Sequence, residues 1–194
     1  TKLLKINNSK STSLHCHPIK KTGFILIKGS VDVDLGFYNT KKLSSIARLM
    51  IRPGLFHSTK NLHNETAVIL EIETPIDKDD LIRFKDEYGR EQKPYEDENF
   101  MQSLSSNEPI FEEPEMNETR RYTVEGVPIE LEKTNDVKKL NKKNKKAIFA
   151  ILDGGLKSKD DKYVLSPGDI VGTETIHKLT EVFKIKDYIT YLSI

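Results

Sequence analysis

Short hydrophobic runs separated by turn residues dominate the first third of the chain. The runs that predict β-strands cover residues 3–6, 23–27, 31–35, 46–51 and 67–72. Residues 31–35 alternate hydrophobic and acidic side chains, which is typical of a strand with one buried face. Strands this short, joined by tight turns, are typical of a β-barrel or a β-sandwich.

The last third of the chain returns to short strands after a polar stretch. Here the predicted strands cover residues 122–124, 129–132, 147–152, 163–165, 182–185 and 188–192. Residues 99–121 are acidic, lack a hydrophobic period and contain Pro109 and Pro114, which predicts a linker on the surface. We therefore expect a first domain at residues 1–98 and a second domain at residues 122–194.

An internal repeat relates the two parts of the chain. Residues 23–29 resemble residues 148–154, and residues 49–54 resemble residues 163–168. Both times the order is a strand, a turn, a second strand and a Pro-Gly pair. The repeat predicts two related domains.

Three histidines in the first part form a candidate metal site. His15 and His17 lie two residues apart in an extended segment, so their side chains point to the same face. Two imidazoles on one face can ligate the same ion. His57 follows the turn at Pro53 and Gly54, which starts a new strand beside the first. The three side chains therefore predict a shared metal ion.

The spacing of these residues resembles the two sequence motifs of the cupin superfamily. The first motif reads His15-x-His17, four residues, Thr22, six residues and Gly29. The second reads Pro53-Gly54, two residues, His57, three residues and Asn61. The resemblance spans roughly residues 2–73.

The resemblance implies an all-β fold, the cupin double-stranded β-helix or jelly-roll barrel, with two cupin domains in tandem. It also implies one divalent metal ion (Zn, Fe, Ni or Mn), ligated by His15, His17 and His57. In the second part of the chain, Leu140, Lys142 and Val171 stand at the ligand positions. We therefore expect the second domain to be a degenerate one without metal.

The chain departs from the cupin motifs at three points. Ser9 stands where the first motif has a glycine, and Pro53 directly precedes Gly54. Thr22 replaces the glutamate that is the usual fourth ligand in these proteins. Since a threonine hydroxyl is a poor ligand at neutral pH, water, substrate or another side chain is expected at the fourth position. An open position of this kind suits a Lewis-acid or oxygen-activating metal.

Two carboxylates are candidate catalytic groups. Glu71 and Glu73 share one face of the strand that begins at Ala67, and a carboxylate beside a metal can act as a general base. The favoured alternative is that this face is exposed to solvent. Phe24 and Leu26 share a face with Thr22, and we expect them to line the barrel as core residues.

Further basic and aromatic residues are candidates for ligand binding. Lys21, with Lys20, is expected near the barrel mouth, and Arg52, with Arg48, flanks the strand before Pro53. Each of them can hold a phosphate or a carboxylate, although an ordinary role on the surface is the favoured alternative. Tyr88 and Arg90 belong to residues 79–96, which we expect to fold over the mouth as a lid, with a helical turn or two at 79–84. This segment resembles the tail of small cupins from surface-sugar biosynthesis clusters.

The resemblance favours a metal-dependent enzyme that acts on a small polar or anionic molecule, namely an isomerase or epimerase of a sugar or sugar phosphate. The first alternative is a three-histidine, iron-dependent dioxygenase, which the missing glutamate favours. The second alternative is a cupin that binds a small ligand without catalysis. Cupin barrels carry many unrelated reactions, so the fold by itself does not decide among these functions.

Composition narrows the classes of partner. The chain has 31 basic and 30 acidic residues, a formal net charge of +1, so no overall field attracts nucleic acid or an acidic membrane. Its single cysteine, Cys16, excludes an internal disulfide and favours a reducing compartment. A lysine-rich run at 135–146 predicts a solvated loop. We expect a cytoplasmic protein with a small-molecule ligand, and the resemblance adds a homodimer.

Overall fold

The computed structural model describes residues 1–85 and 109–194 of the chain. The chain divides into two compact units, Thr1–Asn107 and Glu108–Ile194. The first unit holds the three histidines, and each unit holds one copy of the internal repeat.

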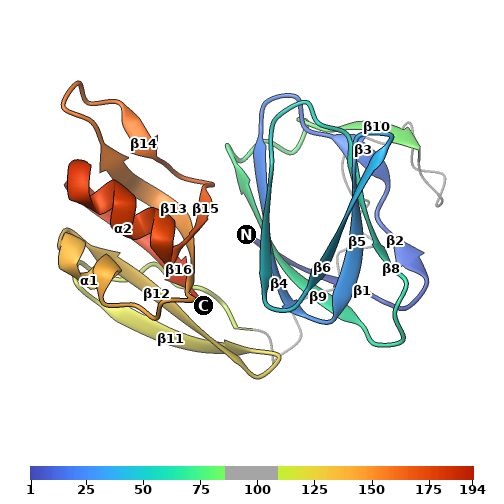
Figure 1. Ribbon diagram of the computed structural model, residues 1–194, viewed down its shortest axis with the longest axis horizontal. Coiled ribbons are helices and arrows are strands. Elements are labelled where there is room, and N and C mark those ends of the chain that lie inside the picture. Colours follow the sequence, from blue (N-terminus) through green and yellow to red (C-terminus); the bar gives the residue numbers. More distant parts are fainter. Residues whose placement is uncertain (86–108) are drawn as a thin grey trace. The chain divides into compact units, whose positions relative to one another are not determined.

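Two antiparallel sheets form the first unit (Figure 1). The first sheet has, in spatial order, β1 (Lys2–Ile6), β9 (Ala67–Thr74), β4 (Lys21–Lys28) and β7 (Ala47–Ile51). The second has β10 (Ile82–Lys85), β3 (Leu14–Cys16), β8 (His57–Asn61), β5 (Ser30–Leu35) and β6 (Asn39–Ser44), and β2 (Lys10–Ser11) pairs with β8.

The chain passes from one sheet to the other almost every time it begins a new strand. From β3 onward, successive strands lie in alternate sheets, apart from the β5–β6 hairpin. This winding is that of a double-stranded β-helix, or jelly roll, and confirms the fold class expected for this part. The helical turn expected at 79–84 is wrong, because residues 82–85 form β10 and pair with β3.

The inside of this barrel is divided into an apolar and a polar part. Leu26 on β4 and Ile69 on β9 pack in the hydrophobic core, and so does Phe24, which confirms the prediction for Phe24 and Leu26. Further along the same faces, β4 presents Thr22 and β9 presents Glu73, which lie opposite each other in the pairing of the two strands. Side chains two apart share a face, so one pair of strands serves both the core and a polar site.

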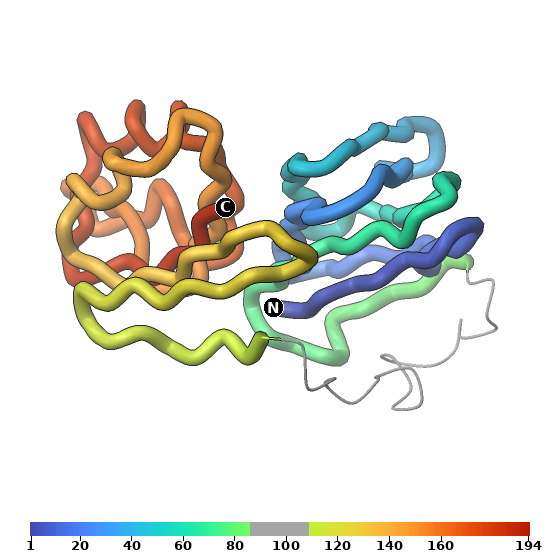
Figure 2. The backbone as a smooth tube through the Cα atoms, turned by 90° about the horizontal axis from the view of Figure 1, so that it is seen from below, coloured from blue at the N-terminus to red at the C-terminus, as the bar shows by residue number. Residues whose placement is uncertain are grey.

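A six-stranded antiparallel sheet and two helices form the second unit (Figure 1). Its strands are β11 (Thr119–Val124), β12 (Val127–Thr134), β16 (Lys184–Ser193), β13 (Ile148–Lys157) and β14 (Tyr163–Leu165), with β15 (Ile170–Gly172) on β13. The arms of the β11–β12 hairpin run side by side (Figure 2). None of the helices in the described residues is long and apolar enough to cross a membrane.

Three sequence expectations for this unit need correction. The lysine-rich run is not only a loop, because it contains the short helix α1 (Val137–Asn141), which buries Leu140 completely. The prediction of a strand at residues 182–185 is wrong for the first two of these residues. Helix α2 (Thr173–Val182) ends there, and β16 then continues without a break through both predicted strands. Strand β11 begins at Thr119, so the last residues of the expected linker are already part of the sheet.

The internal repeat has a structural counterpart. In the first unit β4 pairs with β7, and in the second unit β13 pairs with β14. Gly29 and Gly154 both have positive φ, at +82° and +64°, as do Gly54 and Gly168 at +74° and +87°. Positive φ is costly for other residues, so the repeat preserves the turns as well as the strands.

Candidate metal centre

The three histidines come together inside the first barrel. His15 on β3 pairs directly with His57 on β8, and His17 follows at the end of β3. One ligand atom of each ring lies within 4.8 Å of the others, and no other group of three or more potential ligands is found in the described residues. The ring centroids of His15 and His57 are 4.4 Å apart. The structure therefore confirms that these side chains cluster as the sequence predicts.

Backbone carbonyls orient all three rings. The Nδ1 atoms of His15, His17 and His57 lie 2.8, 2.6 and 3.0 Å from the carbonyl oxygens of Ser13, Asp80 and Leu55. A carbonyl can only accept a hydrogen bond, so each Nδ1 must carry the proton. The Nε2 atoms are then the ones with a free lone pair. Metal-ligating histidines are held in this way in proteins.

The donor set fits a divalent metal ion. His57 Nε2 is buried and has no hydrogen-bond partner, which is costly unless something binds it. Burial lowers the pKa of His57 to about 4. Burial, followed by the nearby His57, lowers the pKa of His15 to about 3, and burial also lowers the pKa of His17. The rings are therefore neutral at pH 7, the form that binds Zn²⁺, Fe²⁺, Ni²⁺ or Mn²⁺.

Asp80 anchors the segment that carries the carbonyl partner of His17. Its buried carboxylate accepts hydrogen bonds from the backbone N–H groups of Ile19 and Lys20 at 3.0 and 2.8 Å. The backbone oxygen of Asp80 meets His17 at the same point. A single residue thus holds both the chain after His17 and the ring of His17.

Replacing Asp80 with alanine is expected to lower metal affinity about 10- to 100-fold, because the segment that carries the carbonyl partner of His17 loses the carboxylate that anchors it. It should also lower the free energy of unfolding by about 1–3 kcal/mol, because two buried N–H groups lose their acceptor. Chelator competition and chemical denaturation measure the two effects. The exposed neighbour Asp79, replaced in the same way, is the control. Equal affinity in the two variants would contradict the orienting role.

Both candidate carboxylates lie inside the barrel, so the favoured alternative of a solvent-exposed face is wrong. Glu71 is 7% exposed, and the side chain of Glu73 is 11% exposed. Glu73 Oε1 lies 3.1 Å from His17 Nε2. Burial opposes ionisation of Glu73, but Lys2, Lys20 and His17 outweigh it and lower its pKa. This carboxylate is therefore ionised beside the histidines at neutral pH.

Three cationic side chains, Lys2, Lys20 and Arg83, lie around the same site. Lys2 Nζ is 2.8 Å from Glu73 Oε2, and the buried Lys20 is 3.4 Å from Glu73 Oε1. Arg83 on β10 lies opposite His15 in the pairing with β3. After burial and the neighbouring histidines, the charge of Arg83 is a further cause that lowers the pKa of His15. Lys2 and Lys20 are thus paired with Glu73, while Arg83 adds a positive charge beside His15.

The other predicted ligand-binding residues do not join the histidine cluster. Lys21 neighbours Thr22 on β4 and so points to the opposite face of the strand. Arg52 is exposed after the end of β7. Tyr88 and Arg90, with the greater part of the expected lid, lie outside the described residues. The sequence does hold a signal that distinguishes the two neighbouring lysines. Adjacent residues in an extended chain point to opposite faces, so only one of Lys20 and Lys21 can face the histidines.

Two motif residues have structural roles. Ser9, at the glycine position of the first motif, has a φ of +58°, a conformation that glycine adopts at lower cost. The side-chain amide of Asn61 donates to the carbonyls of Ile6 and Glu65, both at 2.8 Å, and its oxygen accepts from the His63 N–H. Asn61 therefore links the end of β8 to the neighbouring backbone. These three hydrogen bonds involve none of the three histidines.

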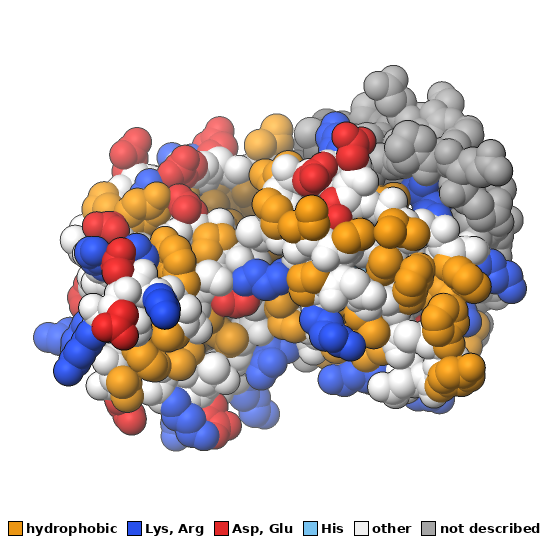
Figure 3. All heavy atoms as spheres, turned by 90° about the horizontal axis from the view of Figure 1, so that it is seen from above, with side chains coloured by type: hydrophobic (Ala, Val, Ile, Leu, Met, Phe, Trp, Pro, Cys, Tyr) orange, Lys and Arg blue, Asp and Glu red, His pale blue; other side chains and the backbone are white. Residues whose placement is uncertain are grey.

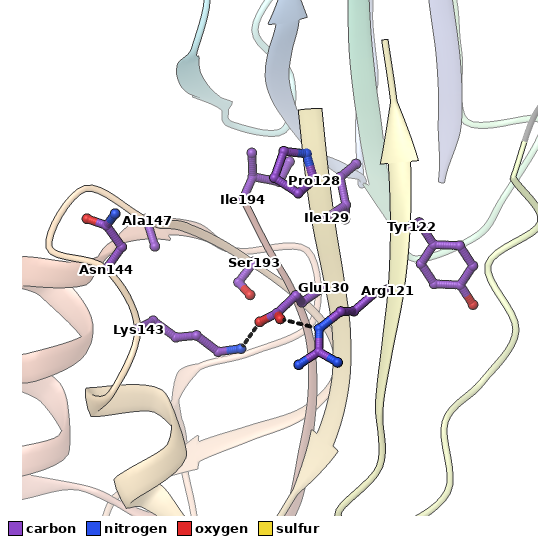
Figure 4. A pocket seen from close by; sticks show the side chains of 10 residues that line it. All are labelled: Arg121, Tyr122, Pro128, Ile129, Glu130, Lys143, Asn144, Ala147, Ser193 and Ile194. Carbon is purple, nitrogen blue, oxygen red and sulfur yellow. Dashed lines mark hydrogen bonds and ion pairs between the residues drawn. The ribbon is translucent and has the colours of Figure 1, made fainter. Parts of the chain in front are cut away.

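The second unit has other residues in place of the ligands. Leu140 is fully buried in its hydrophobic core, Val171 packs against that core, and Lys142 is exposed. A pocket of about 360 Å³ lies in this unit (Figure 4). In it, Glu130 accepts hydrogen bonds from Lys143 and Arg121. Both cations are therefore already compensated by a carboxylate.

The charges on the surface of the second unit are mixed. On the face drawn in Figure 3, its acidic and basic side chains lie next to one another. Because the charges alternate, this face has no extended region of positive or of negative electrostatic potential. The absence of a nucleic-acid partner stays a prediction.

Comparison with known proteins gives matches among solved structures alone. No protein-family model and no curated protein sequence matches the chain. A double-stranded β-helix protein from Klebsiella pneumoniae is 18% identical, with a TM-score of 0.37, over 38% of this chain and 64% of its own. A cupin 2 conserved barrel domain protein from Salinispora arenicola is 14% identical, with a TM-score of 0.33, over 36% of this chain and 56% of its own.

The structural neighbours are cupin-type proteins. A further match is a proposed sugar phosphate isomerase from Acidithiobacillus ferrooxidans, 21% identical, with a TM-score of 0.36, over 39% of this chain and 49% of its own. The chain thus spans about half to two-thirds of the length of these cupin-type neighbours. The metal site is therefore assigned from the geometry of this chain's own residues.

Proposed function

We propose that the first unit binds one divalent metal ion through His15, His17 and His57 and acts with it on a small polar or anionic molecule. The observation that carries this proposal is the convergence of three imidazoles whose Nδ1 atoms are all held by carbonyls. Three protein ligands leave room for a substrate on the ion, as in catalytic metal sites.

The reaction that the surroundings support best is isomerisation or epimerisation of a sugar or sugar phosphate. A bound metal ion would supply Lewis-acid polarisation of a carbonyl oxygen. Either of the carboxylates at Glu71 and Glu73, which have little exposure to solvent, would take up or return a proton at the adjacent carbon. Lys20 and Arg83 lie near the same centre and would orient a phosphate or carboxylate of the substrate.

Proton exchange with solvent tests this reaction directly. The protein is loaded in turn with Zn²⁺, Mn²⁺, Fe²⁺ or Ni²⁺ and incubated in D₂O with a panel of aldoses, ketoses and their phosphates. We expect NMR to show that deuterium replaces the hydrogen next to the carbonyl, and that a chelator stops the exchange. Oxygen consumption by the Fe²⁺ form without such exchange would instead identify a dioxygenase. Binding of a sugar with neither activity would identify a ligand-binding protein.

A further inference from the structure

A carboxylate occupies the space beside the position where the cupin motif has its glutamate. Thr22 stands at that position on β4, and its hydroxyl is buried without a hydrogen-bond partner. Directly opposite Thr22, on the neighbouring strand β9, lies Glu73. Side chains of directly opposed residues start about 5 Å apart on the same face. A glutamate at residue 73 can therefore reach the same region as a glutamate at residue 22.

The distance between Glu73 and His17 fits two ligands of one ion. Metal–ligand bonds of about 2.1 Å place two ligand atoms about 3.0 Å apart at an octahedral angle and about 3.4 Å apart at a tetrahedral one. Glu73 Oε1 and His17 Nε2 are 3.1 Å apart. Since the Nδ1 proton of His17 is used by the Asp80 carbonyl, the Nε2 lone pair faces a carboxylate oxygen. Two electron-rich atoms at this distance repel each other, and a metal cation bound to both of them makes the arrangement favourable.

The second oxygen of the carboxylate is held from outside the site. Lys2 Nζ contacts Glu73 Oε2 at 2.8 Å, which leaves Oε1 directed towards His17. Ligating carboxylates commonly have their orientation set in this way by a neighbouring group. The Lys20 ammonium donates a hydrogen bond to Oε1 at 3.4 Å, so this oxygen would be shared between Lys20 and the ion.

We propose that Glu73 is the fourth protein ligand of the metal ion, so that the carboxylate of the cupin centre has moved from β4 to β9. The proposal rests on the three-histidine site proposed above. One negative ligand lowers the charge of the centre from +2 to +1. With four protein ligands, a substrate can bind only to an ion that accepts five or six ligands in total. This favours Mn²⁺, Fe²⁺ or Ni²⁺ over Zn²⁺, which is usually four-coordinate. Glu71 is left as the carboxylate available for proton transfer.

The test compares Glu73→Gln with Glu71→Gln and the unchanged protein in metal affinity, measured by competition with a chromogenic chelator. Glu71 is the matched control, since it is a buried glutamate on the same face of the same strand. We expect Glu73→Gln to lose about 100-fold or more in affinity for Mn²⁺, because the loss of a ligand should exceed the loss of an outer contact. We expect Glu71→Gln to change affinity by less than about 10-fold.

A crystal structure of the metal-loaded protein gives a second readout that needs no variant to fold. A bond of about 2.0–2.2 Å between the ion and Glu73 supports the proposal. Water at that position overturns it, as does an equal loss of affinity in both glutamine variants. If the unchanged protein binds one ion and Glu73→Gln binds it equally well, only the role of Glu73 fails. If the unchanged protein binds none, the proposed function fails with it.

Discussion

Replacing His57 with alanine is expected to abolish stoichiometric metal binding. His57 contributes the ligand from β8, with its ring centroid 4.4 Å from that of His15 and 5.7 Å from that of His17. Its removal leaves two histidines on one strand and takes away the ligand that joins the two strands β3 and β8. Loss of a ligand from a three-histidine site removes most of the binding free energy.

Elemental analysis after dialysis measures this effect as ions per chain. The matched control is His63→Ala, since His63 is an exposed histidine a few residues further along the chain. We expect one ion per chain in the control and in the unchanged protein, and a background level in His57→Ala. Full metal occupancy in His57→Ala, with the fold intact by circular dichroism, would eliminate the three-histidine site.

Replacing Gly154 with alanine is expected to destabilise the second unit strongly. A Cβ atom at this position would lie 2.1 Å from the carbonyl oxygen of Tyr188, a backbone atom of the neighbouring strand β16, and the φ of +64° is unfavourable for alanine. The strain of that backbone angle costs about 1–3 kcal/mol. The clash must also separate β13 from β16, so we expect a total loss of at least about 3 kcal/mol.

Gly126→Ala separates the two causes. Gly126 lies in the same unit with a φ of +80°, but nothing lies within 4 Å of the added Cβ atom. It should therefore show only the cost of the backbone angle, about 1–3 kcal/mol. Thermal unfolding gives the stabilities, and hydrogen exchange of β13 and β16 locates the change. Equal destabilisation by the two substitutions would show that the contact with Tyr188 has no part in it.

The sequence predicts the barrel and the histidines well, for identifiable physical reasons. Hydrophobic runs between Gly, Pro and Asn turns correspond to β1, β4, β5, β7 and β9. The two-residue spacing of His15 and His17 determines a shared face whatever the neighbouring strand is. His57 then follows from the turn at Gly54, whose N–H donates to the carbonyl of His17 at 2.7 Å.

The surroundings of the histidines were harder to predict, because they depend on which strands become neighbours. Alternation on β9 suggests a polar face at Glu71 and Glu73, and only the pairing with β4 shows that this face looks into the barrel. The place of Arg83 opposite His15 does not follow from the sequence, because the pattern at 79–84 favours a helical turn over the strand β10. Helix α2 was missed because its buried side chains, at Thr173, Ile176 and Thr180, include only one strongly hydrophobic residue.

The hydrogen bonds from the three rings to backbone carbonyls have a consequence for how this site tolerates change. The oxygens belong to the main chain at Ser13, Leu55 and Asp80, and every amino acid has such an oxygen. Substitutions at Leu55 that keep the path of the loop therefore keep the orientation of His57, whereas Ser13 also contributes a hydroxyl 3.2 Å from His15 Nδ1. The support of His57 is thus encoded by the shape of the loop, and sequence change at Leu55 can leave it intact.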